Sequence, residues 1–474
     1  MKIAMFSINP IFPKMVTGGA SKHLFHIARH LGSQGHEVKI FSARSGKNQA
    51  PFPWADHVLV EPVLPFNLPF PQPYAISGGD LALIVERMSA ALQDADRFYM
   101  HDGEFLLPDV YENIPTTISF RDNTYPESVL GSFIGKFDRA ISVSPYSAEV
   151  IKASVGRFYP ELSGRLHQVN NGIDLAMYKP VTTGDFVSRL GVDKDRDFII
   201  LHPHRPEPGK GLPETIQVAH RLVHHHKMAN LKVLVPEWIG SMVSQGESHF
   251  YDEMMHLMRD LGVKDNFIFI PWLSQEQMPA LYSLGDVTLC LGNFVEAFGN
   301  VAYESQACGT PSVVARVGVH RTLLPDEMIA KVDPGDIHAA VDVVLQVASG
   351  GWAVRGELRE YFEAHFNYQQ QVQTYAELIT TCEKQKPMTF TPPVQNPDQA
   401  FQLAPWCYFA GERIYHDFRQ QFEDGGGVVE HLRKDPMITQ KKALAAGVSA
   451  EAWHDWLERT YLVPLLKKEG KSHV

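Results

Sequence analysis

Cysteine is scarce in this sequence, and no two cysteines lie close together. The 474 residues contain four. Disulfide-rich secreted domains need paired cysteines in a short chain, and zinc sites need cysteines or histidines at close spacing. We therefore expect reduced thiols, a cytoplasmic location and no metal centre. The four residues are Cys290, Cys308, Cys382 and Cys407.

Long apolar runs and an excess of positive charge are also missing. The apolar run from Met1 to Ile8 ends at Asn9 and Pro10, too early for the apolar core of a signal peptide or for a membrane span. The formal net charge of −11 disfavours a protein whose main task is to bind nucleic acid or anionic lipid. We expect no transmembrane segment and no nucleic-acid partner.

What the sequence does contain is a repeated alternation of short apolar strands and amphipathic helices. Its length exceeds the roughly 250 to 300 residues of a single core. The alternation runs over residues 1–182 and begins again over residues 185–365, which predicts two Rossmann-like α/β domains with parallel sheets. Within the first domain, the proline-rich stretch 51–73 is predicted to be a long loop.

Two further segments follow the second domain. Residues 366–386 are predicted to form a helix, and the prolines from Pro387 to Pro393 mark a linker. Residues 387–474 as a whole are predicted to be this linker and a helical extension, because the tail is aromatic and has an amphipathic pattern after Ser449. The extension could dock onto the two domains or form a contact in a homo-oligomer.

The most informative stretch runs from Glu296 to Glu304, after an apolar strand and into a helix. The first-turn amides, from Phe298 to Val301, would lack intrahelical partners, and the helix dipole favours an anion such as a diphosphate there. Glu296 could accept hydrogen bonds from sugar hydroxyls, and Glu304 leans back toward the N-terminus and could bind the two hydroxyls of a ribose. The alternative is a solvated glutamate and an acid that compensates the dipole.

A basic motif, from His204 to Gly211, follows the first strand of the second domain. Ligands of open α/β sheets bind at the carboxyl ends of strands, where this motif lies. Arg205 offers a planar fork to phosphate oxygens and Lys210 a compact charge, so together they could neutralise a leaving nucleoside diphosphate without a metal. The alternative is two exposed loop cations.

Taken together, these motifs resemble the retaining glycosyltransferase family 4, whose members have the GT-B fold of two Rossmann-like domains facing a cleft. The resemblance covers about residues 1 to 385, and its motifs are specific in combination. They are Gly18-Gly19 with the helix that follows, Ser142-Val143-Ser144, Asn171-Gly172-Ile173-Asp174 near Lys179-Pro180, Arg205 with Lys210-Gly211, Glu296 to Glu304, Gly309-Thr310-Pro311 and the helix from Phe366 to Tyr375, which in the family crosses back onto the first domain.

The resemblance implies transfer of a hexosyl group from a nucleoside-diphosphate sugar to an acceptor hydroxyl, with retention and without metal or cofactor. It implies that Glu304 holds the ribose, Glu296 the donor sugar, and Arg205 and Lys210 the diphosphate. Gly19 would approach the phosphates from the other domain. The full predicted donor site is Gly18, Gly19, Arg205, Lys210, Pro271, Trp272, Leu273, Glu296, Phe298, Gly299, Asn300, Val301 and Glu304.

The sequence departs from the family pattern in two places. Where family members often have a histidine at the end of a central strand, this chain has Arg121, which cannot act as a base. The change either marks an unusual, for example anionic, donor or acceptor, or leaves the role to Asp122 or the His101-Asp102 pair. The loop from Arg316 to Arg321 also differs from the family's glycine pair and glutamate. The predicted catalytic residues are Glu296, Arg205, Lys210, Arg121, Asp122 and His101.

Several acceptors and one other function are consistent with these motifs. A soluble small molecule or saccharide is the predicted acceptor, because the helix from Gly19 to Leu31 has only Lys22 and Arg29 as fixed cations for a membrane surface. The alternatives are a membrane lipid-linked or polysaccharide acceptor and a catalytically inactive GT-B binding module. A phosphorylase relative would need a pyridoxal-phosphate lysine, for which the sequence has no clear motif.

Overall fold

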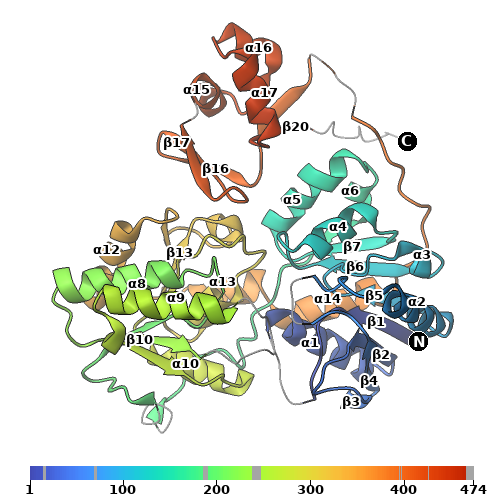
Figure 1. The fold of residues 1–474 in the computed structure, drawn as a ribbon, viewed down its shortest axis with the longest axis horizontal. Coiled ribbons are helices and arrows are strands. Elements are labelled where there is room, and N and C mark those ends of the chain that lie inside the picture. Colours follow the sequence, from blue (N-terminus) through green and yellow to red (C-terminus); the bar gives the residue numbers. More distant parts are fainter. Residues whose placement is uncertain are drawn as a thin grey trace.

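The computed structural model describes residues 1–13, 18–68, 72–184, 190–205, 207–237, 247–393, 396, 398–424 and 426–465. Two α/β domains lie side by side, and the C-terminal extension lies across one end of both (Figure 1). The predicted pair of Rossmann-like domains is confirmed. None of the helices in these ranges is long and apolar enough to cross a bilayer.

The first domain is built on an eight-stranded sheet with the order β3-β4-β2-β1-β5-β6-β7-β8. All neighbouring strands are parallel except β3 and β4, which are antiparallel. The central strand β1 is buried on both faces because helices cover them. The strands are β1 (Lys2–Ser7), β2 (Glu37–Ala43), β3 (Phe52–Ala55), β4 (Val58–Leu64), β5 (Arg97–Met100), β6 (Thr116–Phe120), β7 (Arg139–Ser142) and β8 (Leu166–Gln168). The helices are α1 (Gly19–Ser33), α2 (Gly78–Gln93), α3 (Pro108–Tyr111), α4 (Pro126–Ile134), α5 (Pro145–Ser154) and α6 (Leu162–Arg165).

The proline-rich stretch 51–73 is not a loop throughout, so that prediction was wrong. Its first half forms β3 and β4. Pro53 lies in β3 at the edge of the sheet, and Pro62 lies where the β2–β4 register shifts, and both are places where a strand tolerates a missing N–H group. Residues 69–71 lie outside the described residues.

The second domain is built on a six-stranded, all-parallel sheet with the order β11-β10-β9-β12-β13-β14. Its strands are β9 (Phe198–Leu201), β10 (Leu231–Pro236), β11 (Phe267–Ile270), β12 (Val287–Cys290), β13 (Ser312–Ala315) and β14 (Ala330–Val332). Its helices are α8 (Leu212–His220), α9 (Glu247–Asp260), α10 (Met278–Leu284), α11 (Asn300–Ala307), α12 (Ile337–Ala348) and α13 (Leu358–His365).

Helix α14 (Tyr368–Thr380) links the two domains. Its Tyr375, Ala376 and Ile379 belong to the same buried cluster as Leu24 and Ile27 of α1. The chain therefore leaves the second domain and packs onto the first, where the linker continues: Thr391 N–H donates to the Phe158 carbonyl at 2.7 Å.

The extension is a mixed module and not a helical one, so that prediction was wrong. A strand of four residues or fewer is too short for its alternation of apolar and polar residues to be recognised in an aromatic-rich segment. The predicted helix after Ser449 is present, with Ser449 as its N-cap and Trp453 and Trp456 buried. One three-stranded sheet contains β15 (Ala400–Leu403), β19 (Ile438–Thr439) and β20 (Leu462–Pro464). Another contains β16 (Cys407–Ala410), β17 (Arg413–His416) and β18 (Gln421–Asp424). The helices are α15 (Gly426–Lys434), α16 (Gln440–Ala445) and α17 (Ala450–Glu458).

A buried ion pair holds the extension against both domains. Arg321 of the second domain donates from Nη1 to both carboxylate oxygens of Asp417, at 2.6 and 2.7 Å, and from Nη2 to the Pro405 carbonyl at 2.8 Å. Tyr146 of α5, in the first domain, donates to the same carboxylate at 2.7 Å. Burial tends to raise the pKa of Asp417, and Arg321 opposes this. The extension is therefore part of the interdomain junction.

We expect Asp417→Ala to lower the free energy of unfolding by about 3–5 kcal/mol, because it leaves the buried Arg321 without a counter-charge. Thermal unfolding of the full chain would measure the loss. Asp435→Ala is the control: it removes an exposed partner of Lys442 and should change the midpoint little. Equal midpoints for the two variants would show that the junction contributes nothing to stability.

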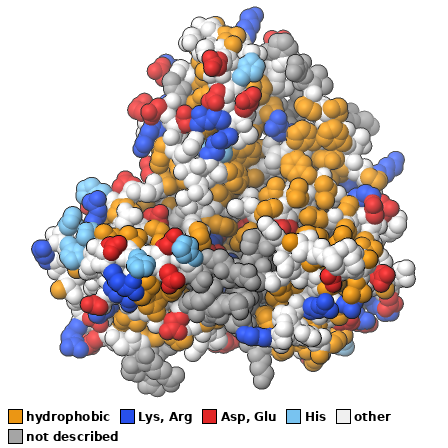
Figure 2. All heavy atoms as spheres, in the orientation of Figure 1, with side chains coloured by type: hydrophobic (Ala, Val, Ile, Leu, Met, Phe, Trp, Pro, Cys, Tyr) orange, Lys and Arg blue, Asp and Glu red, His pale blue; other side chains and the backbone are white. Residues whose placement is uncertain are grey.

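On the face shown in Figure 2, the described residues carry intermixed acidic and basic side chains. Apolar side chains gather over the part of the first domain formed by α4 to α6 in Figure 2, where Val129, Leu130 and Ile134 of α4 are exposed. The same helix begins at the wall of the main cavity described below.

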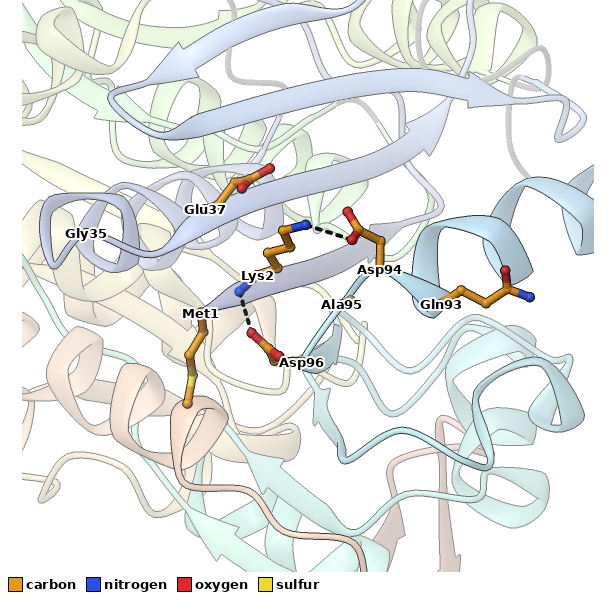
Figure 3. Close-up of a pocket in the computed structure, with 8 residues that line it drawn as sticks. All are labelled: Met1, Lys2, Gly35, Glu37, Gln93, Asp94, Ala95 and Asp96. Atoms are coloured by element: carbon orange, nitrogen blue, oxygen red, sulfur yellow. Dashed lines mark hydrogen bonds and ion pairs between the residues drawn. The ribbon is translucent and has the colours of Figure 1, made fainter.

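A second hollow, of about 560 Å³, lies at the amino ends of β1 and β2 (Figure 3). There Lys2 Nζ donates to Asp94 Oδ1 at 2.7 Å, and the Lys2 N–H donates to Asp96 Oδ2 at 2.8 Å. The charged groups in this hollow pair with one another and are also exposed to water. Ligands of open α/β sheets bind at the carboxyl ends of strands, so this hollow lies at the wrong edge of the sheet for the predicted site.

Candidate functional site

The main cavity lies between the two domains and has a volume of about 1020 Å³. Small-molecule sites typically have about 300–1,000 Å³. Residues that follow the carboxyl ends of β5 and β6 line one wall, and residues that follow β9, β11, β12 and β13 line the other. The strand order thus brings loops that are far apart in sequence to one cleft.

Helix α11 presents its first turn to the cavity. The turn has neither an acidic residue nor a side-chain cap, so its amides keep the positive end of the helix dipole available. Gly299 before it has a φ of 77°, and a Cβ there would lie 2.2 Å from Cε1 of His320, so the position requires glycine. His320 Nδ1 lies 2.8 Å from the Tyr303 hydroxyl, and burial lowers the pKa of His320 to about 4. A neutral imidazole therefore flanks the anion-binding turn.

Lys210 is held beside Glu296. The Phe294 N–H donates to the Gly209 carbonyl at 3.0 Å, which ties the basic loop to the loop before α11. Lys210 Nζ then lies 2.8 Å from Glu296 Oε1 and 3.5 Å from the centre of the Phe294 ring. Burial works to raise the pKa of Glu296, but Lys210 outweighs it and the net pKa is lowered. Glu296 is therefore ionised at neutral pH.

Glu304 sits on α11 and connects the domains. Its Oε1 accepts a hydrogen bond from Lys22 Nζ of α1, and its Oε2 accepts one from the Tyr282 hydroxyl at 3.3 Å. Lys22 also lies 5.0 Å from the centre of the Tyr178 ring. A ribose at Glu304 would have to share or displace Lys22, since both occupy the same carboxylate.

The first turns of α1 and α11 face each other across the cavity. A Cβ on Gly19 would lie 2.8 Å from Asn300 Nδ2, so a larger residue there would require the Asn300 side chain to shift. Like α11, α1 has no acidic residue in its first turn and no side-chain cap. Two positive helix ends therefore converge, which is an arrangement suited to an anion with two phosphate groups. Thr17, the start of the predicted glycine loop, lies outside the described residues.

The structure brings almost all the predicted site residues to this one cavity. The residues that line it are Gly18, Gly19, Arg121, Asp122, Arg205, Lys210, Pro271, Trp272, Leu273, Glu296, Phe298, Gly299, Asn300, Val301 and Glu304. His101 is the exception, because it is not among the lining residues. Its Nε2 lies 3.0 Å from the Ala20 carbonyl oxygen and its Nδ1 lies 2.9 Å from the Tyr99 hydroxyl, so both ring nitrogens are engaged in the core. This places His101 in a supporting position.

Arg121 is buried and tied to several elements. Its guanidinium donates to the Tyr375 hydroxyl of α14 at 3.2 Å and to Asn171 Oδ1 at 3.0 Å, and its Nε lies 3.9 Å from Asp102 Oδ1. Asp122 beside it accepts backbone N–H groups of Thr124, at 2.5 Å, and Tyr125, at 2.8 Å. Burial raises the pKa of Asp122 to about 6. Arg121 thus joins the first domain to α14 as well as facing the cavity.

Sequence reasoning missed several residues that line the cavity: Lys22, Glu104, Glu127, Tyr282 and His320. In the sequence, Lys22 stands out only as a cation for a membrane surface, and His320 only as part of a departure from a family motif. Lys22 follows a glycine turn and His320 follows a buried strand. These positions could have identified both as candidate site residues from the sequence. Glu127 follows a proline in the first turn of α4, where an acid is ordinary.

The comparisons with known proteins agree with this geometry. The family model described as Glycosyltransferase Family 4 matches residues 17–177, and the model described as Glycosyl transferases group 1 matches residues 189–365. The chain belongs to glycosyltransferase family 4. The two matched ranges contain both walls of the cavity.

Relatives among curated proteins are partial matches. The D-inositol 3-phosphate glycosyltransferase 2 of Catenulispora acidiphila is 30% identical over 193 residues, covering 40% of this chain and 44% of that protein. The D-inositol 3-phosphate glycosyltransferase of Acidothermus cellulolyticus is 29% identical over 210 residues, covering 43% and 45%. The chain thus spans about half the length of these curated relatives.

Solved structures share the fold. The sucrose-phosphate synthase from Thermosynechococcus elongatus superposes with a TM-score of 0.65 at 18% identity, over 80% of this chain and 98% of that one. Anabaena HepE, solved in complex with UDP-glucose, gives a TM-score of 0.62 at 18% identity, over 80% and 98%. At this identity the likeness shows the GT-B fold alone.

Proposed function

We propose that this chain is a retaining glycosyltransferase that moves a hexosyl group from a nucleoside-diphosphate sugar to a hydroxyl of a soluble acceptor. The observation that carries the proposal is the convergence of two uncapped helix N-termini, α1 and α11, beside Lys210. The relatives named as D-inositol 3-phosphate glycosyltransferases support glycosyl transfer, and the UDP-glucose complex of HepE supports a sugar-nucleotide donor.

In the proposed reaction, the acceptor oxygen forms a bond to the anomeric carbon while the bond from that carbon to the diphosphate oxygen breaks. The bonding electrons leave with the diphosphate, and the proton of the acceptor hydroxyl passes to a diphosphate oxygen on the same face. The protein's part is to position both substrates and to stabilise the growing charge on the leaving group. Lys210, Arg205 and the first-turn amides of α11 supply that stabilisation.

The roles of the two glutamates follow from their places. Glu296 lies in the loop next to Lys210, near the proposed junction of the sugar and the diphosphate. Glu304 also belongs to the second domain and lies about one turn further along, within α11. The loop Pro271-Trp272-Leu273, after β11, lines the same wall and would receive the base. The four cysteines are free and buried, which supports an enzyme working in the reducing cytoplasm.

A donor screen tests this proposal. The purified full chain would be incubated with UDP-, GDP-, ADP- and TDP-sugars, with and without EDTA, and release of nucleoside diphosphate measured. We expect one donor class to be turned over, and EDTA to leave the rate unchanged because cations of the protein replace a divalent metal. An absolute need for manganese would contradict the charge assignment. Tight binding of a nucleoside diphosphate without turnover of any donor would favour an inactive binding module.

A further inference from the structure

The charges in the cavity do not balance. Each of its four fixed cations has an acidic partner: Lys22 with Glu304, Lys210 with Glu296 at 2.8 Å, Arg205 with Glu207 at 3.1 Å and Arg121 with Asp102 at 3.9 Å. Three more acids line the cavity, namely Glu104, Asp122 and Glu127. All three belong to the first domain, across the cleft from the predicted donor residues. That wall therefore carries three carboxyl groups that have no salt-bridge partner among the described residues.

The surplus acids are held in place by a rigid corner. After β5 the chain turns through Asp102 and Gly103, with φ of 65° and 75°, and Asp is one of the few residues that tolerate this conformation. The Tyr74 hydroxyl donates to the Glu104 carbonyl at 2.6 Å and accepts the Leu106 N–H at 2.8 Å. Glu127 projects from the first turn of α4, which packs against the same corner.

Two carboxylate atoms in this corner have no hydrogen-bond partner among the described residues. They are Asp102 Oδ1 and Glu104 Oε2, and the two residues are only 6% and 4% exposed although both line the cavity. Burial raises the pKa of Asp102 to about 7 and raises the pKa of Glu104 well above its ordinary value, with Asp102, Glu127 and Asp122 adding repulsion. A buried carboxylate without a partner is costly, so the corner favours a bound hydrogen-bond donor that carries positive charge.

We infer that this corner binds a primary ammonium group of the acceptor, so that the acceptor is an amino-substituted saccharide or cyclitol. The inference rests on the proposed function. An ammonium has three donors and one positive charge, which suits Asp102, Glu104 and Glu127 together. A phosphorylated acceptor is disfavoured, because Arg121 already faces Asp102 and the nearby surplus charge is negative. In the described part of the chain, no three acids and histidines are arranged to hold a metal ion.

The ammonium is a recognition handle and takes no part in the bond changes. The acceptor hydroxyl would lie closer to Asp122, whose environment includes Lys210 and Glu296 and therefore the reacting end of the donor. An anionic acceptor, one of the alternatives that Arg121 raises in the sequence, has the opposite charge, so matched sugars can distinguish the two.

Binding of matched sugars to the full chain, saturated with the nucleoside diphosphate that it prefers, gives the direct test. The probes are glucosamine and mannosamine, their N-acetyl forms, glucose, and glucose 6-phosphate, measured by calorimetry and, as acceptors, by nucleoside diphosphate release. We expect an amine probe to bind about 10-fold or more tightly than its N-acetyl form, since a charged hydrogen bond is lost. Equal or tighter binding of the neutral or phosphorylated sugars, or no binding of either amine, would overturn the inference.

Variants assign the effect to the corner. Glu104→Gln and Glu127→Gln should each remove most of the preference for the amine over its N-acetyl form, and Glu149→Gln, on the exposed face of α5, should retain it. If donor hydrolysis itself were absent from the parent chain, the proposed function would fail and the binding comparison would still stand or fall on its own. An unchanged amine preference in both variants would overturn the assignment.

Stability provides the check that Glu104→Gln is folded. A carboxyl whose pKa is higher in the folded protein than in the unfolded chain favours folding at low pH, and this contribution is lost as the pH rises through the folded pKa. Asp102, Glu127 and Asp122 repel an ionised Glu104, and Ser128 acts in the opposite direction. Without ligand, Glu104→Gln should therefore raise the unfolding temperature at pH 8 more than at pH 5. A lower unfolding temperature at pH 8 would show that Glu104 is stabilised by internal contacts, contrary to the inference.

Discussion

Lys210→Ala is expected to lower kcat by on the order of 10²-fold or more, with a much smaller effect on donor affinity. Negative charge on the diphosphate grows as the glycosidic bond breaks, so an interaction with Lys210 strengthens in the transition state and contributes to turnover more than to binding. Steady-state kinetics with the donor from the hydrolysis screen, together with calorimetric binding of that donor, would separate the two effects.

Removing Lys210 also changes Glu296. Lys210 is the main group that lowers the pKa of this buried carboxyl, so without it burial dominates and the pKa rises. If ionised Glu296 is needed, the acidic limb of the kcat profile should shift to higher pH in the variant. Lys264→Ala is the matched control, because Lys264 lies beside Phe269 of β11 and does not line the cavity. If Lys210→Ala left kcat unchanged and weakened donor binding, Lys210 would bind the ground state and the transition state equally well.

The sequence predicts the parallel strands of the two domains and much of the donor wall, because both depend on local patterns. Apolar runs followed by glycine turns place Lys210 and Glu296 at the carboxyl ends of neighbouring strands, and the parallel order of β9 and β12 then brings them together. Helix polarity adds the anion site at α11. Within one domain, motif and topology therefore suffice to name Arg205, Lys210, the two glutamates and the first turn of α11 in that wall.

The interdomain features could not be predicted in this way. The partnership of Lys22 with Glu304 depends on how the domains meet, and no pattern within either domain encodes it. The surplus acids at Glu104 and Glu127 look like ordinary loop and helix-end residues in sequence. The sequence offers His101 as an alternative base because Arg121 cannot act as one, whereas the His101 ring turns toward Tyr99 and the α1 backbone.

The C-terminal extension shows a different limit. Its strands have four residues or fewer, so a period of two cannot be distinguished from chance in an aromatic-rich segment. In the sequence, Arg321 stands out only as part of a departure from a family loop. In the structure its guanidinium binds Asp417, almost a hundred residues later in the chain. Because Arg321 directly follows His320, docking of the extension also fixes the loop that flanks the first turn of α11.

Glu304→Ala is expected to weaken nucleoside diphosphate binding by roughly 10- to 100-fold, the loss of hydrogen bonds to a charged group. Ribose hydroxyls change little during the reaction, so the loss should appear in binding more than in turnover at saturation. Calorimetry with free nucleoside diphosphate isolates this effect, because that ligand has the ribose but no sugar. Glu296→Ala is the internal control: its affinity for the same ligand should be unchanged or higher, since Lys210 loses a competing carboxylate.

The contact between Lys22 and Glu304 makes the test sharper. Glu304→Ala releases Lys22 next to the first turn of α1, where a diphosphate is expected. Inorganic pyrophosphate lacks a ribose, so its affinity should stay the same or rise in Glu304→Ala while nucleoside diphosphate affinity falls. The double variant Lys22→Ala/Glu304→Ala should lose any such gain for pyrophosphate. Parallel losses for pyrophosphate and nucleoside diphosphate in folded Glu304→Ala would place Glu304 on the phosphates or in a structural role, and the proposed donor orientation would have to be reversed.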